Sequence, residues 1–182
     1  MNQKQKGNSF ERKVAKDLSI WIFGDKDVLK RHPTSGFDKS IYSGDIIPLK
    51  QIHWDKFPFY IETKHGYKNQ IPSFYNWEII NKWIKKAIEE MKNLKDQKIL
   101  WLICKFQGHK TLFITSFPFN IEYIIPLKIY PLKDVLKKSD VFWIYIYEYD
   151  KVLSQEFENA LKKLDNLEDN FKCYYLELNQ QH

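Results

Sequence analysis

The stretch Phe57 to Lys64, of sequence FPFYIETK, decides the fold of this chain. Aromatic and β-branched residues fill it, which predicts a buried β-strand ending at His65-Gly66. Side chains alternate along a strand, so Glu62 and Lys64 point to the same face. The stretch therefore predicts a carboxylate and an ammonium held side by side at the end of a strand.

A helix and two short strands are predicted before this stretch. The helix begins at Ser9, carries apolar residues at helical spacing and ends before Gly24. Proline, threonine, serine and glycine then indicate a loop between the two short strands. The expected ranges are 9–23 for the helix, 27–31 and 45–49 for the strands, and 32–42 for the loop.

A second helix and further strands are predicted after it. The helix covers 74–94, residues 98–106 and 111–117 form a β-hairpin, and a strand (141–149), a helix (152–164) and a last strand (171–178) follow. This order predicts an α/β fold with a mixed central β-sheet flanked by helices. We expect a single domain over residues 1–182, because no linker or repeat divides the 182 residues.

Composition favours a globular protein with a polyanionic partner. Hydrophobic residues make up 43% of the chain, enough for a core, and aromatic residues make up 16%. The aromatic residues suit either a core or base-stacking surfaces. The net charge of +6 favours nucleic acid. Lysine supplies 27 of the 29 basic residues, which a coding sequence rich in A and T also explains.

Several classes of protein are disfavoured by the sequence. Cys104 and Cys173 lie far apart among apolar residues, which indicates two reduced thiols. The five histidines form no cluster, so a structural zinc site is not expected. With no signal peptide and no run of about 18 apolar residues, we expect an intracellular, cytoplasmic protein, in the host cytoplasm if the source is viral.

The pair Glu62 and Lys64 suits phosphodiester hydrolysis. A carboxylate binds Mg²⁺, which polarises the phosphate and acidifies a bound water, while the lysine orients that water and offsets negative charge. An acidic residue two positions before a lysine occurs four times in the chain, and only this pair lies on a predicted strand. The alternative is a surface ion pair, worth roughly 0–1 kcal/mol.

Two further carboxylates lie upstream in the chain. Asp45 begins a short strand, and a hairpin-like pairing with the Glu62 strand brings two hard oxygen ligands together. A turn residue after Gly44 is the alternative for Asp45. Glu11 lies in the first turns of the leading helix, where an acidic residue also favours the helix dipole.

Four segments together resemble the PD-(D/E)xK nuclease superfamily, and most closely the archaeal-type and phage Holliday-junction resolvases. They are Lys6-Gly7-Asn8-Ser9-Phe10-Glu11-Arg12, Thr34-Ser35-Gly36, Gly44-Asp45-Ile46 and Phe59-Tyr60-Ile61-Glu62-Thr63-Lys64. The resemblance implies a restriction-endonuclease-like core over about 5–117. It leaves residues 119–182 as an extension of strand, helix and strand without a counterpart.

The resemblance also implies an active site. Its catalytic residues are Glu11, Asp45, Glu62 and Lys64, and its metal ligands are Asp45, Glu62, the Thr63 carbonyl and Glu11. Arg12 contacts the DNA backbone and Ser35 lies close to the scissile phosphate. The cofactor is Mg²⁺, with Mn²⁺ as a substitute, as one ion or two.

The function implied is metal-dependent cleavage of branched DNA, the four-way junction above all. A four-way junction has two-fold symmetry, so paired cuts require a homodimer. Two alternatives stay open: a restriction- or repair-type endonuclease of the same superfamily, and a catalytically inactive DNA-binding protein on that fold. Two departures are visible, since Gly44 stands where the superfamily name has proline, and residues 50–56 lengthen the gap between Asp45 and Glu62.

Overall fold

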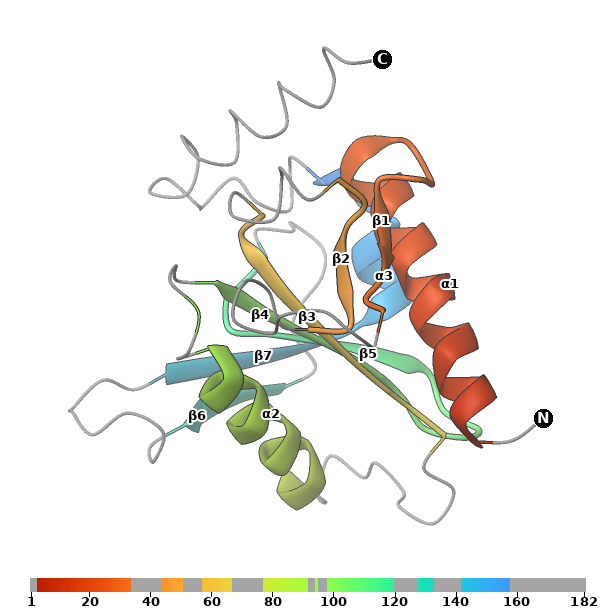
Figure 1. Ribbon diagram of the computed structural model, residues 1–182. Helices are drawn as coiled ribbons and strands as arrows, with labels where there is room; N and C mark the ends of the chain where they lie inside the picture. Colours follow the sequence, from red (N-terminus) through yellow and green to blue (C-terminus); the bar gives the residue numbers. More distant parts are fainter. Residues whose placement is uncertain are drawn as a thin grey trace.

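The structure is a computed structural model that describes residues 3–33, 44–50, 57–66, 77–91, 94, 98–119, 128–132 and 142–157. Within these residues the chain forms a seven-stranded sheet of order β1-β2-β3-β4-β5-β7-β6, with helices on both faces (Figure 1). The predicted α/β fold with a mixed central sheet is confirmed.

The elements follow one another in the order expected for the first two thirds of the chain. They are α1 (Gln3–Phe23), β1 (Leu29–Arg31), β2 (Ile46–Pro48), β3 (Phe59–His65), α2 (Trp77–Met91), β4 (Ile99–Lys105), β5 (Thr111–Thr115), β6 (Lys128–Leu132), β7 (Phe142–Glu148) and α3 (Tyr149–Leu153).

One pair of neighbouring strands is parallel, and the pairs on either side of it are antiparallel. β3 and β4 run in parallel, in a register from Phe59 opposite Ile99 to His65 opposite Lys105. Parallel neighbours need a crossover connection, and α2 lies in that connection between β3 and β4. β2 pairs antiparallel with β3 through Ile46 and Ile61, which is the hairpin-like arrangement predicted for these strands.

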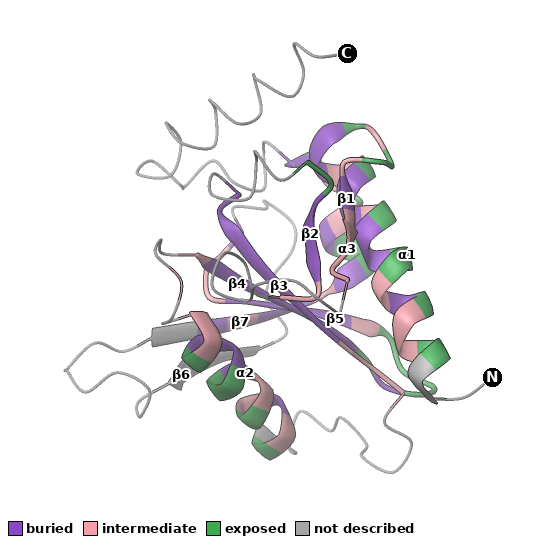
Figure 2. Cartoon of the chain, in the orientation of Figure 1, coloured by how far each residue is buried: buried purple, intermediate pink, exposed green. Residues whose placement is uncertain are grey.

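The sheet separates two hydrophobic cores. α1 and α3 cover one face, with Phe59 and Ile61 of β3 facing them, and α2 covers the other, where Tyr60 points (Figures 1 and 2). Because β3 is covered on both sides, its first five residues are all buried. Any polar side chain placed on the middle of β3 is therefore held in a largely dry environment.

Most of the described aromatic side chains belong to the core beneath α1. Phe59 stacks on Trp101 with ring centroids 3.7 Å apart. Trp21 of α1 lies against Trp101 at 5.9 Å, and its Nε1–H donates to the carbonyl of Gln155 at 2.7 Å. The aromatic composition suits either a core or base-stacking surfaces, and these rings belong to the core.

α1 is attached to the edge of the sheet by a buried hydrogen bond. The backbone N–H of Leu29 donates to Ser19 Oγ at 2.7 Å, and Ser19 is fully buried. The Leu29 amide of β1 is not paired with β2. Its acceptor is Ser19 of α1 instead, and this hydrogen bond satisfies it.

Replacing Ser19 with alanine is expected to lower the free energy of unfolding by roughly 1–3 kcal/mol, because the buried Leu29 amide loses its acceptor. Urea unfolding followed by circular dichroism measures the change. Ser154→Ala serves as the control, since Ser154 is exposed and should change stability by less than about 0.5 kcal/mol. Equal effects of the two substitutions would contradict the role assigned to Ser19.

Some sequence predictions differ from the structure. α1 begins at Gln3, six residues before the expected start, because glutamine and lysine are good helix formers. The strand β6 was not predicted. The helix predicted over 152–164 is wrong at 154–156, since α3 spans Tyr149–Leu153 and the chain leaves the helix at Ser154. Residues 158–182, with the predicted last strand and Cys173, lie outside the described residues.

Cys104 is buried and free of any disulfide, as predicted, and burial raises the pKa of its thiol to about 12. None of the helices described in the structure combines the length and the apolar character that crossing a membrane would require.

Candidate active site

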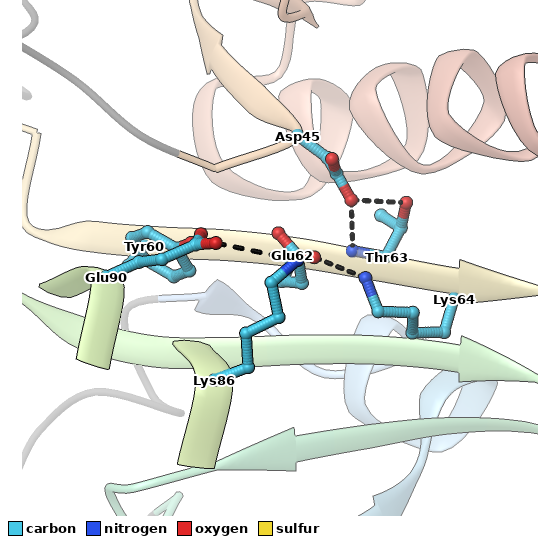
Figure 3. Close-up of polar contacts among 7 residues, drawn as sticks. All are labelled: Asp45, Tyr60, Glu62, Thr63, Lys64, Lys86 and Glu90. Atoms are coloured by element: carbon cyan, nitrogen blue, oxygen red, sulfur yellow. Dashed lines mark hydrogen bonds and ion pairs between the residues drawn. The ribbon is translucent and has the colours of Figure 1, made fainter. Parts of the chain in front are cut away.

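Glu62 and Lys64 lie side by side on the last half of β3 (Figure 3). The two side chains point to the face covered by α2, and Lys64 Nζ donates to Glu62 Oε1 in an ion pair. Only 11% of the Glu62 side chain and 18% of the Lys64 side chain are exposed, so solvent screens this pair weakly. The alternation predicted from the sequence is confirmed, and the pair is not one of the exposed surface pairs that contribute little.

Asp45 faces the same part of β3 from the neighbouring chain segment. Its backbone N–H donates to the carbonyl of Ile61 at 2.7 Å, which places it one step before the β2–β3 pairing. Its carboxylate oxygen Oδ2 accepts hydrogen bonds from Thr63 N at 2.7 Å and from Thr63 Oγ1 at 3.0 Å (Figure 3). The Asp45 carboxylate is thus fixed beside the Glu62–Lys64 pair by two donors of the residue between them.

Gly44 lets the chain approach β3 this closely. Its φ of +120° is one that residues with a side chain rarely adopt, and a Cβ at this position would lie 3.0 Å from the carbonyl oxygen of Ile61. Proline has φ near −65°, so it cannot replace Gly44 in this backbone. The departure from the superfamily name at this position therefore has a steric cause.

Glu11 reaches the edge of the site from α1. Its carboxylate accepts a hydrogen bond from Nε of Arg31 on β1, and both side chains are 18% exposed. Burial and the negative charge of Asp45 raise the pKa of Glu11, while Arg31 and Lys64 act in the opposite direction. Glu11 thus interacts electrostatically with Asp45 and Lys64, although its direct partner is an arginine that the sequence did not single out.

Negative charge dominates the electrostatics around Glu62. Burial, followed by the charge of Asp45, raises the pKa of Glu62 to about 7, and the neighbouring Lys64 only partly offsets this. A carboxylate whose pKa is raised by a neighbouring negative charge lies in a potential that attracts a cation. Asp45 and Glu62 supply hard oxygen atoms, which is the ligand type that Mg²⁺ and Mn²⁺ prefer.

α2 brings a further acidic residue that the sequence did not reveal. Glu90 accepts a hydrogen bond from the Tyr60 hydroxyl at 2.5 Å and lies 3.5 Å from Lys86 Nζ (Figure 3). Tyr60 is fully buried, and burial together with the charges of Glu62 and Glu90 raises its pKa. The alternation of side chains along β3 places Tyr60 on the same face as Glu62, and this was the sequence signal that could have directed attention to the partner of Tyr60.

The three predicted carboxylates are not gathered into one ligand shell. Within the described part of the chain, no group of three or more His, Cys, Asp or Glu side chains is close enough to hold a metal ion. Each carboxylate instead has its own protein partner: Arg31 for Glu11, Thr63 for Asp45 and Lys64 for Glu62. Asp45 and Glu62 nevertheless supply oxygen donors of the type that a divalent ion prefers, and Glu11 interacts electrostatically with Asp45.

The two predicted substrate-binding residues differ in what the structure says of them. Arg12 is exposed on α1 and lines a basic hollow of about 410 Å³ with Lys16, Lys26, Lys30 and Arg31. The chain's two arginines thus lie at the same place, next to Glu11. Ser35 lies outside the described residues.

Comparison with known proteins identifies the family. The family described as "Phage putative PDDEXK endonuclease" matches residues 2–177 of the chain. No curated protein and no solved structure matches the chain. The superfamily predicted from the four sequence segments is confirmed, and nucleases of this superfamily generally use divalent metal ions. The chain therefore belongs to the phage PD-(D/E)xK endonuclease family, and it is a nuclease that acts on DNA.

Proposed function

We propose that this endonuclease cleaves branched DNA, with the four-way junction as its main substrate, at a site formed by Asp45, Glu62 and Lys64. The observation that carries the proposal is the weakly exposed Glu62–Lys64 pair, with the Asp45 carboxylate fixed beside it by Thr63. The junction follows from the resemblance of four motif segments to Holliday-junction resolvases.

Mg²⁺, replaceable by Mn²⁺, is the proposed cofactor. Asp45 and Glu62 would hold it, together with the Thr63 carbonyl and with Glu11 at the border of the site. A bound ion polarises the phosphate and lowers the pKa of a coordinated water. The fit rests on the hard oxygen donors and on the mutual repulsion of Asp45 and Glu62, which a cation relieves.

The chain's own residues divide the remaining work. Lys64 turns from its partner Glu62 to hold the attacking water and to neutralise charge that builds up on the phosphate. Thr63 keeps Asp45 in place through two hydrogen bonds. Arg12 and Ser35 contact the DNA strand. The reaction breaks the P–O3′ bond and leaves a 5′-phosphate.

Paired cuts in a four-way junction require two active sites, so we propose a homodimer. The proposed organisation is one domain over residues 1–182, with the catalytic core at about 5–117 and an extension at about 119–182. Sedimentation analysis of the protein with and without a junction tests the dimer.

The decisive experiment incubates the purified protein with Mg²⁺ and end-labelled DNA as a four-way junction, a flap, a nicked duplex and a linear duplex. We expect the junction to be cut fastest, and Glu62→Ala to cut none of the substrates. Preferential cutting of linear duplex at particular sequences would instead indicate a restriction-type enzyme. Equal behaviour of the protein and Glu62→Ala on all four substrates would leave only DNA binding on a nuclease fold.

Lys64→Met is expected to separate metal binding from cleavage. The substitution removes a positive charge next to Glu62, so divalent ions should bind as tightly as before or more tightly. Cleavage should slow by about 10²-fold or more, because the group that positions the water is lost. Calorimetric titration with Mn²⁺ and single-turnover cleavage measure the two quantities. A parallel loss of both would show that Lys64 acts only by keeping the site folded.

A further inference from the structure

A second group of polar side chains lies on the opposite face of the sheet from Glu62 and Lys64, at the end of the same strand. Here the last residue of β3, the last of β4 and the first of β5 stand in register, His65 opposite Lys105 and Lys105 opposite Thr111. In-register neighbours point to the same face. The three strand ends therefore form a polar row on the face covered by α1.

The first turns of α1 lie over this row. Lys6, Ser9 and Lys13 share one side of this helix and line the hollow beside the row. The Phe10 ring packs on His65 with centroids 4.9 Å apart, which fixes the helix against the strand end. Between the helix and the row is an open hollow of about 470 Å³, closed at one side by the start of α3.

The charges that line the hollow are mainly positive and only partly compensated. Lys13 is paired with Asp17 at 2.5 Å. Lys6 and Lys105 are exposed, and neither side-chain ammonium forms a hydrogen bond or ion pair with the described residues. Asp150 is the single acidic residue of the lining. The hollow therefore offers two available ammonium groups, with hydroxyls nearby.

The lining suits a phosphate group better than a base. Ser9 and Thr111 add hydroxyl donors to the lysines, and this combination is common where proteins contact the DNA backbone. Stacking of a base would require an open ring face, but Phe10 is 8% exposed and Tyr149 2% exposed. His65 has a buried Nδ1 with no partner among the described residues, a group that a ligand contact can satisfy.

The position of the hollow relates it to the cleavage site. His65 directly follows Lys64, so the two Cα atoms are about 3.8 Å apart while their side chains point to opposite faces. A DNA strand with one phosphate at Lys64 would have to pass the end of β3 to place a later phosphate in the hollow.

We propose that Lys6 and Lys105 form a second phosphate-binding site, which holds the backbone of the substrate strand beyond the cleaved bond. The inference rests on the proposed function for the position of the cleaved phosphate, but its test requires no cleavage. Each lysine that contacts a phosphate releases counterions, so its loss lowers the salt dependence of DNA binding by about 0.9 in the log–log slope.

The test measures binding of a short labelled DNA duplex by fluorescence anisotropy at several salt concentrations between about 50 and 200 mM, with a chelator present to prevent cleavage. The proteins compared are wild type, Lys6→Ala, Lys105→Ala and the control Lys82→Ala. Lys82 is another exposed lysine, on α2 and paired with Glu78, so all three variants lose the same charge.

We expect Lys6→Ala and Lys105→Ala each to lower the slope by about 0.9, and Lys82→Ala to leave it unchanged. The proposal would be overturned if Lys6→Ala and Lys105→Ala had the same slope as wild type, or if Lys82→Ala lowered the slope by the same amount. Either result would point to another partner for the hollow. Repeating the titration with and without a 5′-terminal phosphate distinguishes the two sources of the phosphate: sensitivity to it identifies a strand end, and insensitivity an internal phosphodiester.

The outcome is separable from that of the proposed function. If the junction is not cut but the two lysine variants lower the slope, the second phosphate site stands without the resolvase activity. If the junction is cut and the slopes are equal, the cleavage site stands and the second phosphate site is refuted.

Discussion

Glu62→Gln is expected to abolish cleavage and, at the same time, to stabilise the metal-free protein above about pH 7. The loss of cleavage follows because glutamine removes the negative charge with which Glu62 would hold the proposed cation. We expect cleavage to slow by at least about 10³-fold, at the upper end of what one electrostatic group contributes.

The stabilisation follows from the pKa of Glu62. Burial and Asp45 raise it from 4.5 to about 7, so between these values the folded protein binds more protons than the unfolded chain. The free energy of unfolding therefore falls as pH rises from about 4.5 to about 7. Glutamine resembles the protonated carboxyl and avoids this loss, which is on the order of 3 kcal/mol for such a shift.

Thermal unfolding of both proteins at about pH 5 and about pH 8, with a chelator present, measures the effect. The melting temperatures should be similar at the lower pH, and the variant should melt higher at the upper pH. Glu78→Gln is the matched control, because this glutamate on α2 is 74% exposed and should change neither quantity. A variant less stable than wild type at the upper pH would show that the Lys64 pair dominates.

Gly44→Ala is expected to impair both folding and cleavage. The backbone at φ +120° disfavours any side chain, and the new Cβ would lie 3.0 Å from the Ile61 carbonyl oxygen, which belongs to the backbone of a central strand. A strained residue of this kind costs roughly 1–3 kcal/mol. Relief of the contact moves Asp45, and a displacement of about 1 Å at a catalytic group can slow a reaction about 10²-fold.

Gly108→Ala provides the comparison. Gly108 also has a positive φ, of +79°, but a Cβ there meets no atom within 4 Å. The Gly108 variant should lose stability through backbone strain alone and keep the rate of cleavage. Chemical unfolding and single-turnover cleavage of both variants test this. If the Gly44 and Gly108 variants cleave at the same rate, Gly44 does not position Asp45.

The central features of the fold could be predicted from local sequence. The aromatic and β-branched run of β3 has no competing interpretation, and its alternation places Glu62 and Lys64 together without knowledge of any other element. Asp45 could be placed beside β3 because a short apolar segment after a turn suggested a hairpin-like pair. Local pattern was sufficient wherever one strand or one turn decides the geometry.

Features that depend on distant segments could not be predicted. Arg31 is 20 residues from its partner Glu11, and Glu90 is 30 residues from the Tyr60 hydroxyl. The strand β6 contains Pro131, which argues against a central strand, but β6 lies at the edge of the sheet, where proline is tolerated. Sequence patterns contain no information on which edge an element will occupy.

The hydrogen bond from Trp21 to Gln155 joins parts of the chain that are 134 residues apart. Trp21 belongs to α1, the helix that carries Glu11, while Gln155 follows β7 and α3 in the chain. A nascent chain that ends earlier leaves the indole N–H unsatisfied and the ring cluster around it incomplete. The packing of α1, the helix that carries Glu11, therefore depends on residues as far along the chain as Gln155 and Phe157.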